Sequence, residues 1–200
     1  MSSDSAEGGS PSPPKKKMKK PKKKNPRSIP NILITGTPGT GKSRLSKSVS
    51  EALPDMKWIN IGEYAKEHKF LGEWDEKYQC HELDEDPLLD SLEAHAAKGG
   101  LLIDHHIPDL YPERFFDAVF VLRAKTSLLH DRLSGRGYKD KKLEDNIQCE
   151  IFQTILEESR ESYDEKIVFE LPSNHESDLE SNIESVKKWI GDWIDNKKKS

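Results

Sequence analysis

A short apolar segment that runs into a glycine-rich loop constrains this chain more than any other feature. The segment Ile32–Thr35 leads directly into Gly-Thr-Pro-Gly-Thr-Gly-Lys-Ser, which ends at Ser43. Apolar residues then recur with the spacing of one helical face, at Leu45, Val49, Ala52 and Leu53. A buried strand, a glycine-rich turn and a helix in this order predict a loop that binds phosphate.

The residue types of this loop indicate its ligand. Gly36, Gly41, Lys42 and Ser43 satisfy the pattern G-x-x-x-x-G-K-S. Glycines let backbone N–H groups turn inward around phosphate oxygens, and the helix N-terminus adds its positive end. We expect Lys42 to neutralise charge on the β- and γ-phosphates and the Ser43 hydroxyl to bind Mg²⁺. The loop therefore predicts a nucleoside triphosphate with Mg²⁺, and an ordinary glycine-rich turn is the alternative.

The identity of the base is less directly encoded. The N/T-K-x-D signature with which GTPases recognise guanine is absent, which favours ATP. The string GTPGTGK is also similar to the loop of the AAA+ ATPases. Those enzymes need a much longer module and a helical lid domain, and a chain of 200 residues has no room for both.

Strands and helices alternate over residues 30–196. Apolar runs predict strands at 31–35, 57–61, 101–104, 118–122 and 166–171. Helical spacing predicts helices after the loop and at 84–97, 126–134, 142–162 and 176–195. An apolar stripe on the helix 142–162 comprises Leu143, Ile147, Ile151 and Ile155, whereas residues 62–83 show no strong period. This alternation predicts an α/β fold with a five-stranded parallel sheet covered by helices on both faces.

The composition separates a basic arm from an acidic body. Residues 1–28 carry eight Lys and one Arg against Asp4 and Glu7, a balance of +7, which leaves −11 on the rest of a chain whose net charge is −4. No apolar run reaches the ~18 to 20 residues of a membrane span, and no secretory signal is evident. The separated Cys80 and Cys149 are typical of free thiols in a reducing compartment.

The basic arm has its own possible functions. Residues 1–29 are rich in Ser, Pro, Gly and Lys and are expected to be disordered. Eight of the ten residues from Lys15 to Lys24 are lysines, which indicates a nuclear-import signal or an arm that binds nucleic acid, unless the arm only improves solubility. A second, shorter basic tail is expected at 197–200. No membrane partner is expected.

A second candidate site follows the strand at 101–104. Asp104 ends this strand, where ligands of open parallel sheets lie, and it is expected to orient Mg²⁺ or a water bound to it. His106 is expected to orient a water or an acceptor hydroxyl beside the γ-phosphate. The alternatives are that Asp104 caps a turn and that His106 fills space, and filling space is the favoured interpretation of His105. A zinc site is disfavoured, because no further ligands stand at a suitable spacing.

A glycine-flanked arginine suggests a lid. Gly135 and Gly137 bracket Arg136, and a basic cluster follows. A flexible loop that carries a cation suits a lid closing over a triphosphate, because Arg can grip a phosphate with two hydrogen bonds. A surface arginine in a solvated turn is the alternative for Arg136, and it is an equally good interpretation of Arg132.

Several strings of this chain resemble the adenylate kinase isoenzyme 6 family. They are NILITGTPGTGKS, WINIGEYAKE, LDED, LLIDHH, YPERFFDAVFVLR, RGYKDKKLEDNIQCEIFQ and ELPSN, and together they cover about residues 30–195. The resemblance implies a P-loop nucleoside-monophosphate-kinase fold with an NMP-binding segment at 60–83 and a short lid at 135–145. It also implies nucleoside monophosphate kinase and ATPase activities, nuclear and cytoplasmic localisation, and a role in small-ribosomal-subunit maturation through a basic small-subunit ribosomal protein.

The resemblance further implies which residues contact ATP. The positions carried over are Gly39, Gly41, Lys42, Ser43 and Arg44 from the loop and Arg136 from the lid. Gly36 and Thr40 of the loop and His175, on the adenine side, are also expected to contact ATP. Three positions depart from the usual pattern. His-His-Ile-Pro follows Asp104, where ordinary adenylate kinases have Gly-x-Pro-Arg, and Lys66 and His175 stand where the family often has Arg and Lys.

Three functions therefore remain open from the sequence. The first is transfer of phosphate from ATP to AMP or a related NMP, with Lys42, Asp104, His106 and Arg136 as catalytic residues. The second is an ATP-driven assembly factor that grips a basic partner, which an acidic body would attract. The third is a kinase of another small acceptor. The acceptor side separates them, and its candidate residues are Lys66, His68, Lys77, His81 and Arg114.

Overall fold

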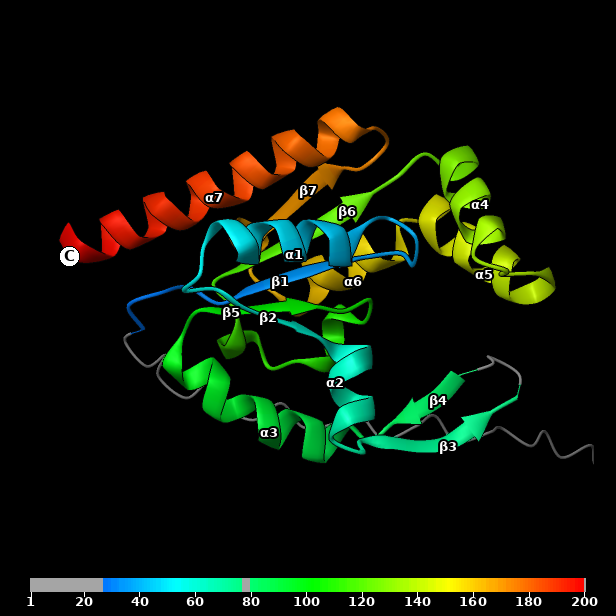
Figure 1. The fold of residues 1–200 in the computed structure, drawn as a ribbon, viewed down its shortest axis with the longest axis horizontal. Coiled ribbons are helices and arrows are strands. Elements are labelled where there is room, and N and C mark those ends of the chain that lie inside the picture. Colours follow the sequence, from blue (N-terminus) through cyan, green and yellow to red (C-terminus); the bar gives the residue numbers. More distant parts are fainter. Residues whose placement is uncertain (1–26, 77–79, 200) are drawn as a thin grey trace, which may run out of the picture.

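A five-stranded parallel sheet forms the centre of the molecule. The structure is a computed structural model that describes residues 27–76 and 80–199 (Figure 1). The strand order is β2-β5-β1-β6-β7. The strands are β1 (Ile32–Gly36), β2 (Lys57–Asn60), β5 (Leu101–Asp104), β6 (Ala118–Arg123) and β7 (Val168–Pro172). The predicted α/β class and the five-stranded parallel sheet are confirmed.

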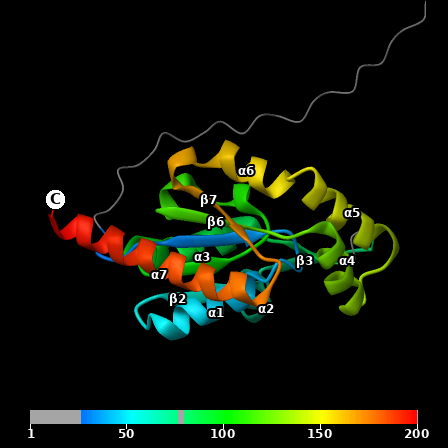
Figure 2. The same ribbon diagram turned by 90° about the horizontal axis from the view of Figure 1, so that it is seen from above.

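Helices cover both faces of this sheet, as Figure 2 shows. They are α1 (Lys42–Ala52), α2 (Ile61–Glu67), α3 (Glu85–Lys98), α4 (Thr126–Gly135), α5 (Asp140–Ile151), α6 (Thr154–Ser162) and α7 (Glu176–Lys199). Short 3₁₀ helices are η1 (Pro108–Leu110), η2 (Glu113–Phe115) and η3 (Glu165–Ile167). Because side chains alternate along a strand, Leu33 of β1 packs in the core with α3 and α6, whereas Ile32 and Ile34 pack with α1 and α7.

The carboxyl ends of three neighbouring strands meet at one edge of the sheet. Asp104, the last residue of β5, is in register with Ile34 of β1 and with Asn60 of β2. The loop after β1 therefore begins beside Asp104, and α2 begins directly after Asn60. Parallel pairing places these polar residues together, where open α/β sheets bind their ligands.

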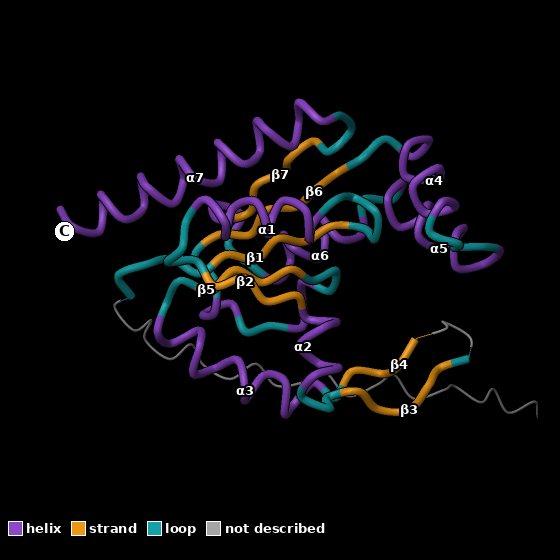
Figure 3. Tube along the Cα trace, viewed as in Figure 1, coloured by secondary structure: helices purple, strands orange, loops and turns teal. Residues whose placement is uncertain are grey.

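The segment 62–83, which has no clear period, folds into two units. Most of α2 lies in it, followed by a two-stranded antiparallel hairpin of β3 (Leu71–Asp75) and β4 (Cys80–Leu83). Figure 3 shows this hairpin apart from the central sheet. The hairpin strands expose most of their side chains, and Trp74 is 52% exposed. They therefore lack the apolar alternation by which a half-buried strand is recognised in a sequence.

The predicted helix 142–162 is wrong as a single helix. α5 ends at Ile151 and α6 begins at Thr154, because Gln153 between them has a left-handed backbone with φ of 57°. The predicted stripe is interrupted with it: Ile155 is buried, but Ile151 is 55% exposed. A left-handed residue turns the chain and rotates the second helix relative to the first. Side chains at helical spacing therefore no longer share a face.

The folded body begins earlier and ends later in the sequence than the predicted range of 30–196. The Arg27 side chain is 5% exposed, donates to the carbonyl oxygen of Ala96 at 2.9 Å and pairs with Asp117 at 3.0 Å. The body therefore includes Arg27 to Ile29, and the rest of the predicted arm, residues 1–26, lies outside the described residues. At the other end, α7 continues to Lys199, where lysines favour the negative end of the helix dipole.

Within the part of the chain that the structure describes, no helix combines the length and apolar character that crossing a membrane requires.

Candidate functional site

A cavity of about 1250 Å³ lies at the carboxyl ends of the parallel strands. The predicted site residues that line it are Gly39, Gly41, Lys42, Ser43, Arg44, Asp104, His106, Arg136 and His175. These residues come from segments far apart in the sequence. Gly36 and Thr40 do not line the cavity, although both belong to the same loop. The structure thus brings most of the predicted site into one place.

The phosphate-binding loop needs its glycines for two physical reasons. Gly39 and Gly41 have φ of 91° and 95°, in the left-handed region that residues with a Cβ rarely adopt. A Cβ on Gly36 would lie 2.5 Å from the carbonyl oxygen of Leu122, so β6 leaves no room for a side chain there. The buried Thr40 stabilises the loop through a hydrogen bond within it, because its Oγ1 donates to the Thr37 carbonyl oxygen at 2.8 Å.

Lys42 folds back over the loop that precedes it. Its Nζ donates to the carbonyl oxygens of Gly36 and Thr37 at 2.9 and 3.3 Å. Burial of the ammonium group lowers the pKa of Lys42 to about 8, with a further contribution from the positive charge of Arg136, while Asp104 opposes the shift. Lys42 therefore stays mostly protonated at pH 7 and is placed to meet a phosphate held by the loop.

Asn60 joins the two predicted metal-binding residues, and the sequence interpretation missed it. Its Nδ2 donates to Asp104 Oδ2 at 2.8 Å and lies 3.4 Å from Ser43 Oγ. Its Oδ1 accepts from the backbone N–H of Glu63, so Asn60 is also the N-cap of α2. An Asn between a strand and a helix is a recognisable capping signal, but its contact with Asp104 depends on the neighbouring strand.

The arrangement of Ser43 and Asp104 fits a hard divalent cation. Asp104 is 3% exposed, Ser43 opens to the cavity, and both offer oxygen ligands. Mg²⁺ commonly takes one or two protein oxygens together with phosphate oxygens and water. In residues 27–76 and 80–199, no group of three or more His, Cys, Asp or Glu side chains is arranged to hold a metal by itself. Mg²⁺ bound together with the triphosphate suits this donor set.

The two histidines after Asp104 have different surroundings. His105 is 7% exposed, and its Nδ1 shares a hydrogen bond of 2.8 Å with the Tyr111 hydroxyl. Burial lowers the pKa of His105 well below its usual value, so the ring is neutral. These contacts agree with the favoured interpretation of His105 as a packed side chain, although it also reaches the cavity wall.

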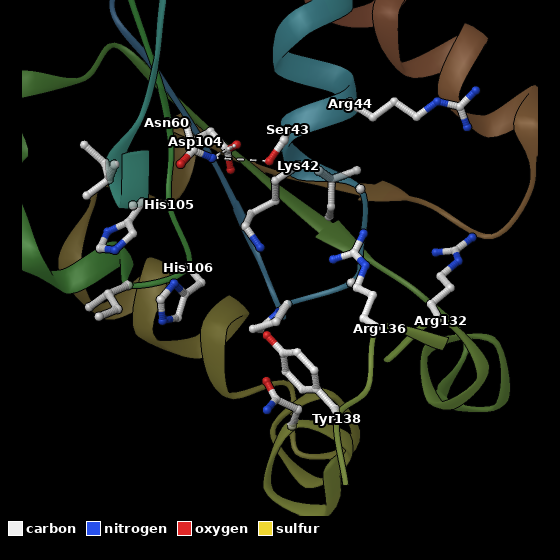
Figure 4. A pocket seen from close by; sticks show the side chains of 18 of the residues that line it. Lys42, Ser43, Arg44, Asn60, Asp104, His105, His106, Arg132, Arg136 and Tyr138 are labelled. Atoms are coloured by element: carbon white, nitrogen blue, oxygen red, sulfur yellow. Dashed lines mark hydrogen bonds between the residues drawn. The ribbon is translucent and has the colours of Figure 1, made fainter. Parts of the chain in front are cut away.

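His106 is exposed on the cavity wall, and Figure 4 shows it on the opposite side of Lys42 from Arg136. Desolvation in the cleft and the charge of Lys42 lower the pKa of His106 to about 4. Solvent in the cleft screens this effect, but the direction keeps the ring neutral at pH 7. A neutral imidazole can accept a hydrogen bond from a hydroxyl or a water.

The arginines in and near the predicted lid segment 135–145 are placed differently from one another. Arg136 follows α4 and points into the cavity (Figure 4). The Arg132 guanidinium donates to the carbonyl oxygens of Ser173 and Asn174 at 2.8 and 2.9 Å and holds the loop before α7. Arg44 pairs with Glu176 at the start of α7, with Nη1 to Oε2 at 2.7 Å, and its guanidinium turns away from the phosphate-binding loop (Figure 4).

The resemblance implies that His175 contacts adenine, and the structure shows its surroundings. It lines the cavity just before α7, and its backbone N–H donates to Asp178 Oδ2 at 3.0 Å. Hydrogen bonds from the backbone N–H groups of Asn174 and His175 lower the pKa of Asp178. Asp178 therefore caps the helix and fixes the loop that carries His175.

We call one side of the cavity the donor half and the other the acceptor half. The donor half comprises its lining residues from 38–44, 122–146 and 173–179, and the acceptor half those from 60–62, 71–85 and 105–107. The cationic residues on the wall are all in the donor half: Lys42, Arg44, Arg132, Arg136 and Lys142. Among the described lining residues, the charged ones of the acceptor half are acidic: Asp75, Glu82 and Glu85.

Most of the expected acceptor-side residues point elsewhere. Of those that the structure describes, only His81 lines the cavity. Arg114 pairs with Glu93 at 2.8 Å, His68 stacks on Tyr64, and Lys66 is outside the cavity wall. Lys77 lies outside the described residues. Lys66 and His68 lie in or at the end of α2, and Arg114 lies in η2. The residue types alone did not predict these elements, so they did not predict where the side chains point.

Comparison with known proteins identifies the relatives of this chain. A family described as AAA domain matches residues 32–153. The chain is 49% identical to "Adenylate kinase isoenzyme 6 homolog" of Drosophila melanogaster, over 82% of this chain and 93% of that protein. It is 47% identical to the homolog of the same name in Caenorhabditis elegans, over 82% of this chain and 91% of that protein. This chain belongs to the adenylate kinase isoenzyme 6 family.

The family membership and the fold define the class of enzyme. A yeast member, "Adenylate kinase isoenzyme 6 homolog FAP7" of Saccharomyces cerevisiae, is 40% identical over 83% of this chain and 84% of that protein. A shikimate kinase structure from Bacteroides thetaiotaomicron has a TM-score of 0.57 at 16% identity, over 82% of this chain and 99% of that chain, and shows the same fold. With the phosphate-binding loop, these relatives make the chain a P-loop enzyme of the nucleotide kinase and ATPase type.

Proposed function

We propose that this adenylate kinase isoenzyme 6 family member transfers the γ-phosphoryl group of ATP to AMP or a related nucleoside monophosphate and also hydrolyses ATP. The observation that carries the proposal is the meeting of Lys42, Asp104 and His106 in one cavity, with Arg136 opposite His106. Phosphoryl transfer needs charge neutralisation and in-line positioning more than covalent chemistry. These residues supply both.

The donor half binds and neutralises the triphosphate. Backbone N–H groups of the loop and Lys42 hold the β- and γ-phosphates, and Arg136 approaches from the lid. Ser43 and Asp104 would hold Mg²⁺, which would supply positive charge to the triphosphate, and Asn60 keeps Asp104 in place through its 2.8 Å hydrogen bond. The γ-phosphorus bonds to the attacking oxygen as its bond to the bridging oxygen breaks, and ADP leaves with that oxygen.

His106 serves the attacking oxygen in this scheme. Its ring is neutral at pH 7, because its pKa is lowered to about 4. A group this weakly basic orients a hydroxyl or a water by accepting a hydrogen bond better than it removes a proton. The neutral ring also keeps one N–H, which can donate to an oxygen of an NMP phosphate, so transfer and hydrolysis compete at one position.

A second candidate is an ATPase switch or assembly factor with little NMP kinase activity. The observation that favours it is the acceptor half, where Glu82 and Glu85 would repel a monophosphate and no described lining residue is Lys or Arg. Residues 29–200 carry a balance of −11, which would attract a basic small-subunit ribosomal protein. Small-subunit maturation would then be the biological purpose. A kinase of another small acceptor is a third possibility on the same fold.

The basic arm supports a proposal on localisation. Its lysines from Lys15 to Lys24 suit nuclear import, or transient binding to a pre-ribosome, alongside a cytoplasmic pool. Deleting residues 1–26 retains the buried Arg27, and we expect ATP turnover to persist while nuclear accumulation falls. Unchanged nuclear accumulation of the truncated protein would contradict a role of the arm in nuclear import.

One assay separates the candidates. ATP consumption is followed with and without each NMP, and diphosphates and inorganic phosphate are measured separately on the same sample. Two diphosphates per ATP with AMP present support transfer, whereas phosphate release that no NMP changes supports the ATPase switch. A folded, pure protein that binds ATP and consumes none under any of these conditions would contradict both.

A further inference from the structure

The last turn of α5 buries a carboxylate. Every residue of α5 is described, and Glu150 alone among them is buried, at 2% exposure. Charged side chains are rarely buried without partners, because removal from water disfavours the ionised form. The partners of Glu150 therefore indicate why it is there.

Glu150 joins three segments that are distant in the sequence. Its Oε1 accepts from Arg123 Nε at 2.7 Å, at the end of β6, and from the backbone N–H of Ala124 at 3.0 Å, directly after β6. Its Oε2 accepts from Thr37 Oγ1 in the phosphate-binding loop at 2.5 Å. The carbonyl oxygen of Glu150 also accepts from Arg123 Nη2 at 3.1 Å. Both carboxylate oxygens are thus used.

Thr37 is a key residue for the shape of the loop. Its carbonyl oxygen accepts from Lys42 Nζ at 3.3 Å, from the backbone N–H of Thr40 at 3.2 Å and from Thr40 Oγ1 at 2.8 Å. The Thr37 side chain is 1% exposed. A group that fixes the Thr37 hydroxyl therefore also influences the part of the loop that faces Lys42.

Glu150 is also connected to the lid. α5 begins at Asp140, shortly after Arg136 and Tyr138, and Lys142 near its start lines the cavity with them. α4 and α5 pack against each other, and α5 carries Lys142 near its start and Glu150 in its last turn. Displacement of α5 would move Glu150 relative to Thr37.

From this geometry, and on the basis of the function proposed above, we propose that Glu150 is a positioning residue. It couples α5 to the phosphate-binding loop through Thr37 and orients the loop for phosphoryl transfer. A carboxylate is needed because it accepts three hydrogen bonds at once and is partnered by Arg123. Glutamine has the same shape, but its amide nitrogen cannot accept the hydroxyl proton of Thr37.

The test is steady-state kinetics of Glu150→Gln with ATP, alone and with AMP. We expect kcat to fall about 10- to 100-fold, the range for a lost hydrogen bond to a charged group, and the KM for ATP to change less. Glu144→Gln is the matched control, because Glu144 lies on the same helix and is exposed. Thermal unfolding of both variants is measured in parallel.

Thr37 provides a second route if Glu150→Gln fails to fold. Thr37→Val removes the donor and should lower kcat as Glu150→Gln does, whereas Thr37→Ser retains the hydroxyl and should restore most of the turnover. If the two residues act through one another, the double variant Thr37→Val with Glu150→Gln loses less than the product of the single losses.

The outcomes distinguish this inference from the function on which it rests. A wild-type protein that consumes no ATP contradicts the proposed function and the coupling with it. An active wild type with normal kcat in folded Glu150→Gln or Thr37→Val contradicts the coupling alone. A lowered unfolding temperature with unchanged kcat would likewise contradict the coupling, because Glu150 would then stabilise the fold without orienting the loop for catalysis.

Discussion

The two halves of the cavity differ in how completely they are built. In the donor half, the loop glycines, Lys42 and Arg136 combine backbone N–H groups with positive charge. In the acceptor half, the charged lining residues include the acidic Glu82 and Glu85, and none of the described lining residues is Lys or Arg. This difference indicates that the chain specifies a phosphate-binding loop more completely than it specifies an acceptor. Four predictions test it, from the largest expected effect to the smallest.

The largest effect is expected at Lys42. Lys42→Ala should lower both NMP transfer and ATP hydrolysis about 10²- to 10³-fold, because the lost contact neutralises charge that develops in the transition state. Turnover with and without AMP is the measurement, together with circular dichroism as a check of folding. Lys47→Ala, one turn further along α1 on an exposed surface, is the control. Near-normal turnover in folded Lys42→Ala would contradict the role of Lys42 and of the donor half in catalysis.

His106 belongs to the acceptor half, and its substitution shows which of the two proposed reactions it serves. His106→Gly should lower turnover about 10²-fold while ATP affinity stays nearly unchanged, because no contact of the phosphate-binding loop is lost. Diphosphate and phosphate are measured separately on one preparation, with the exposed His130→Gly as control.

The result for His106→Gly has three informative forms. Loss of hydrolysis alone assigns His106 to the water, and loss of both reactions assigns it to either attacking group. Unchanged values for both reactions would make His106 a side chain that only fills the end of the strand.

The pH dependence of ATP affinity should come from the donor half. The pKa of Lys42 is lowered to about 8, so its charge is present at pH 7 and is lost as the pH rises above 8. A bound triphosphate stabilises the charged form, so affinity should fall about tenfold between pH 7 and 9. Calorimetry in two buffers of different ionisation enthalpy should show proton uptake on binding at pH 9. Affinity independent of pH over this range would contradict the lowered pKa.

The smallest effect is expected in the acceptor half. Glu82→Lys replaces a like charge on the cavity wall with a cation, and the KM for AMP should fall about two- to fivefold, as for an exposed ion pair. The KM for ATP should not change. Glu180→Lys, exposed on α7, controls for the change in net charge. An unchanged KM for AMP in a variant that still transfers phosphate would place the acceptor away from Glu82.

Local patterns predicted much of the fold and of the donor half. Apolar runs located all five strands of the sheet, since parallel strands are buried on both faces. Gly39 and Gly41 are required by the left-handed backbone angles at their own positions, and glycine is the residue that adopts such angles readily. The expectations that were wrong concern the break at Gln153 and the side chains Lys66, His68 and Arg114, whose directions depend on neighbouring elements.

The sequence by itself determined the phosphate-binding loop, the strand that ends at Asp104 and the charge contrast between arm and body. Only the tertiary structure decided that Asn60 bridges Asp104 and Ser43 and that Glu150 reaches Thr37, 113 residues away. The physical reason is the range of the interactions. Backbone angles and side-chain periodicity act over a few residues, whereas these hydrogen bonds form only after sheet order and helix packing have brought distant segments together.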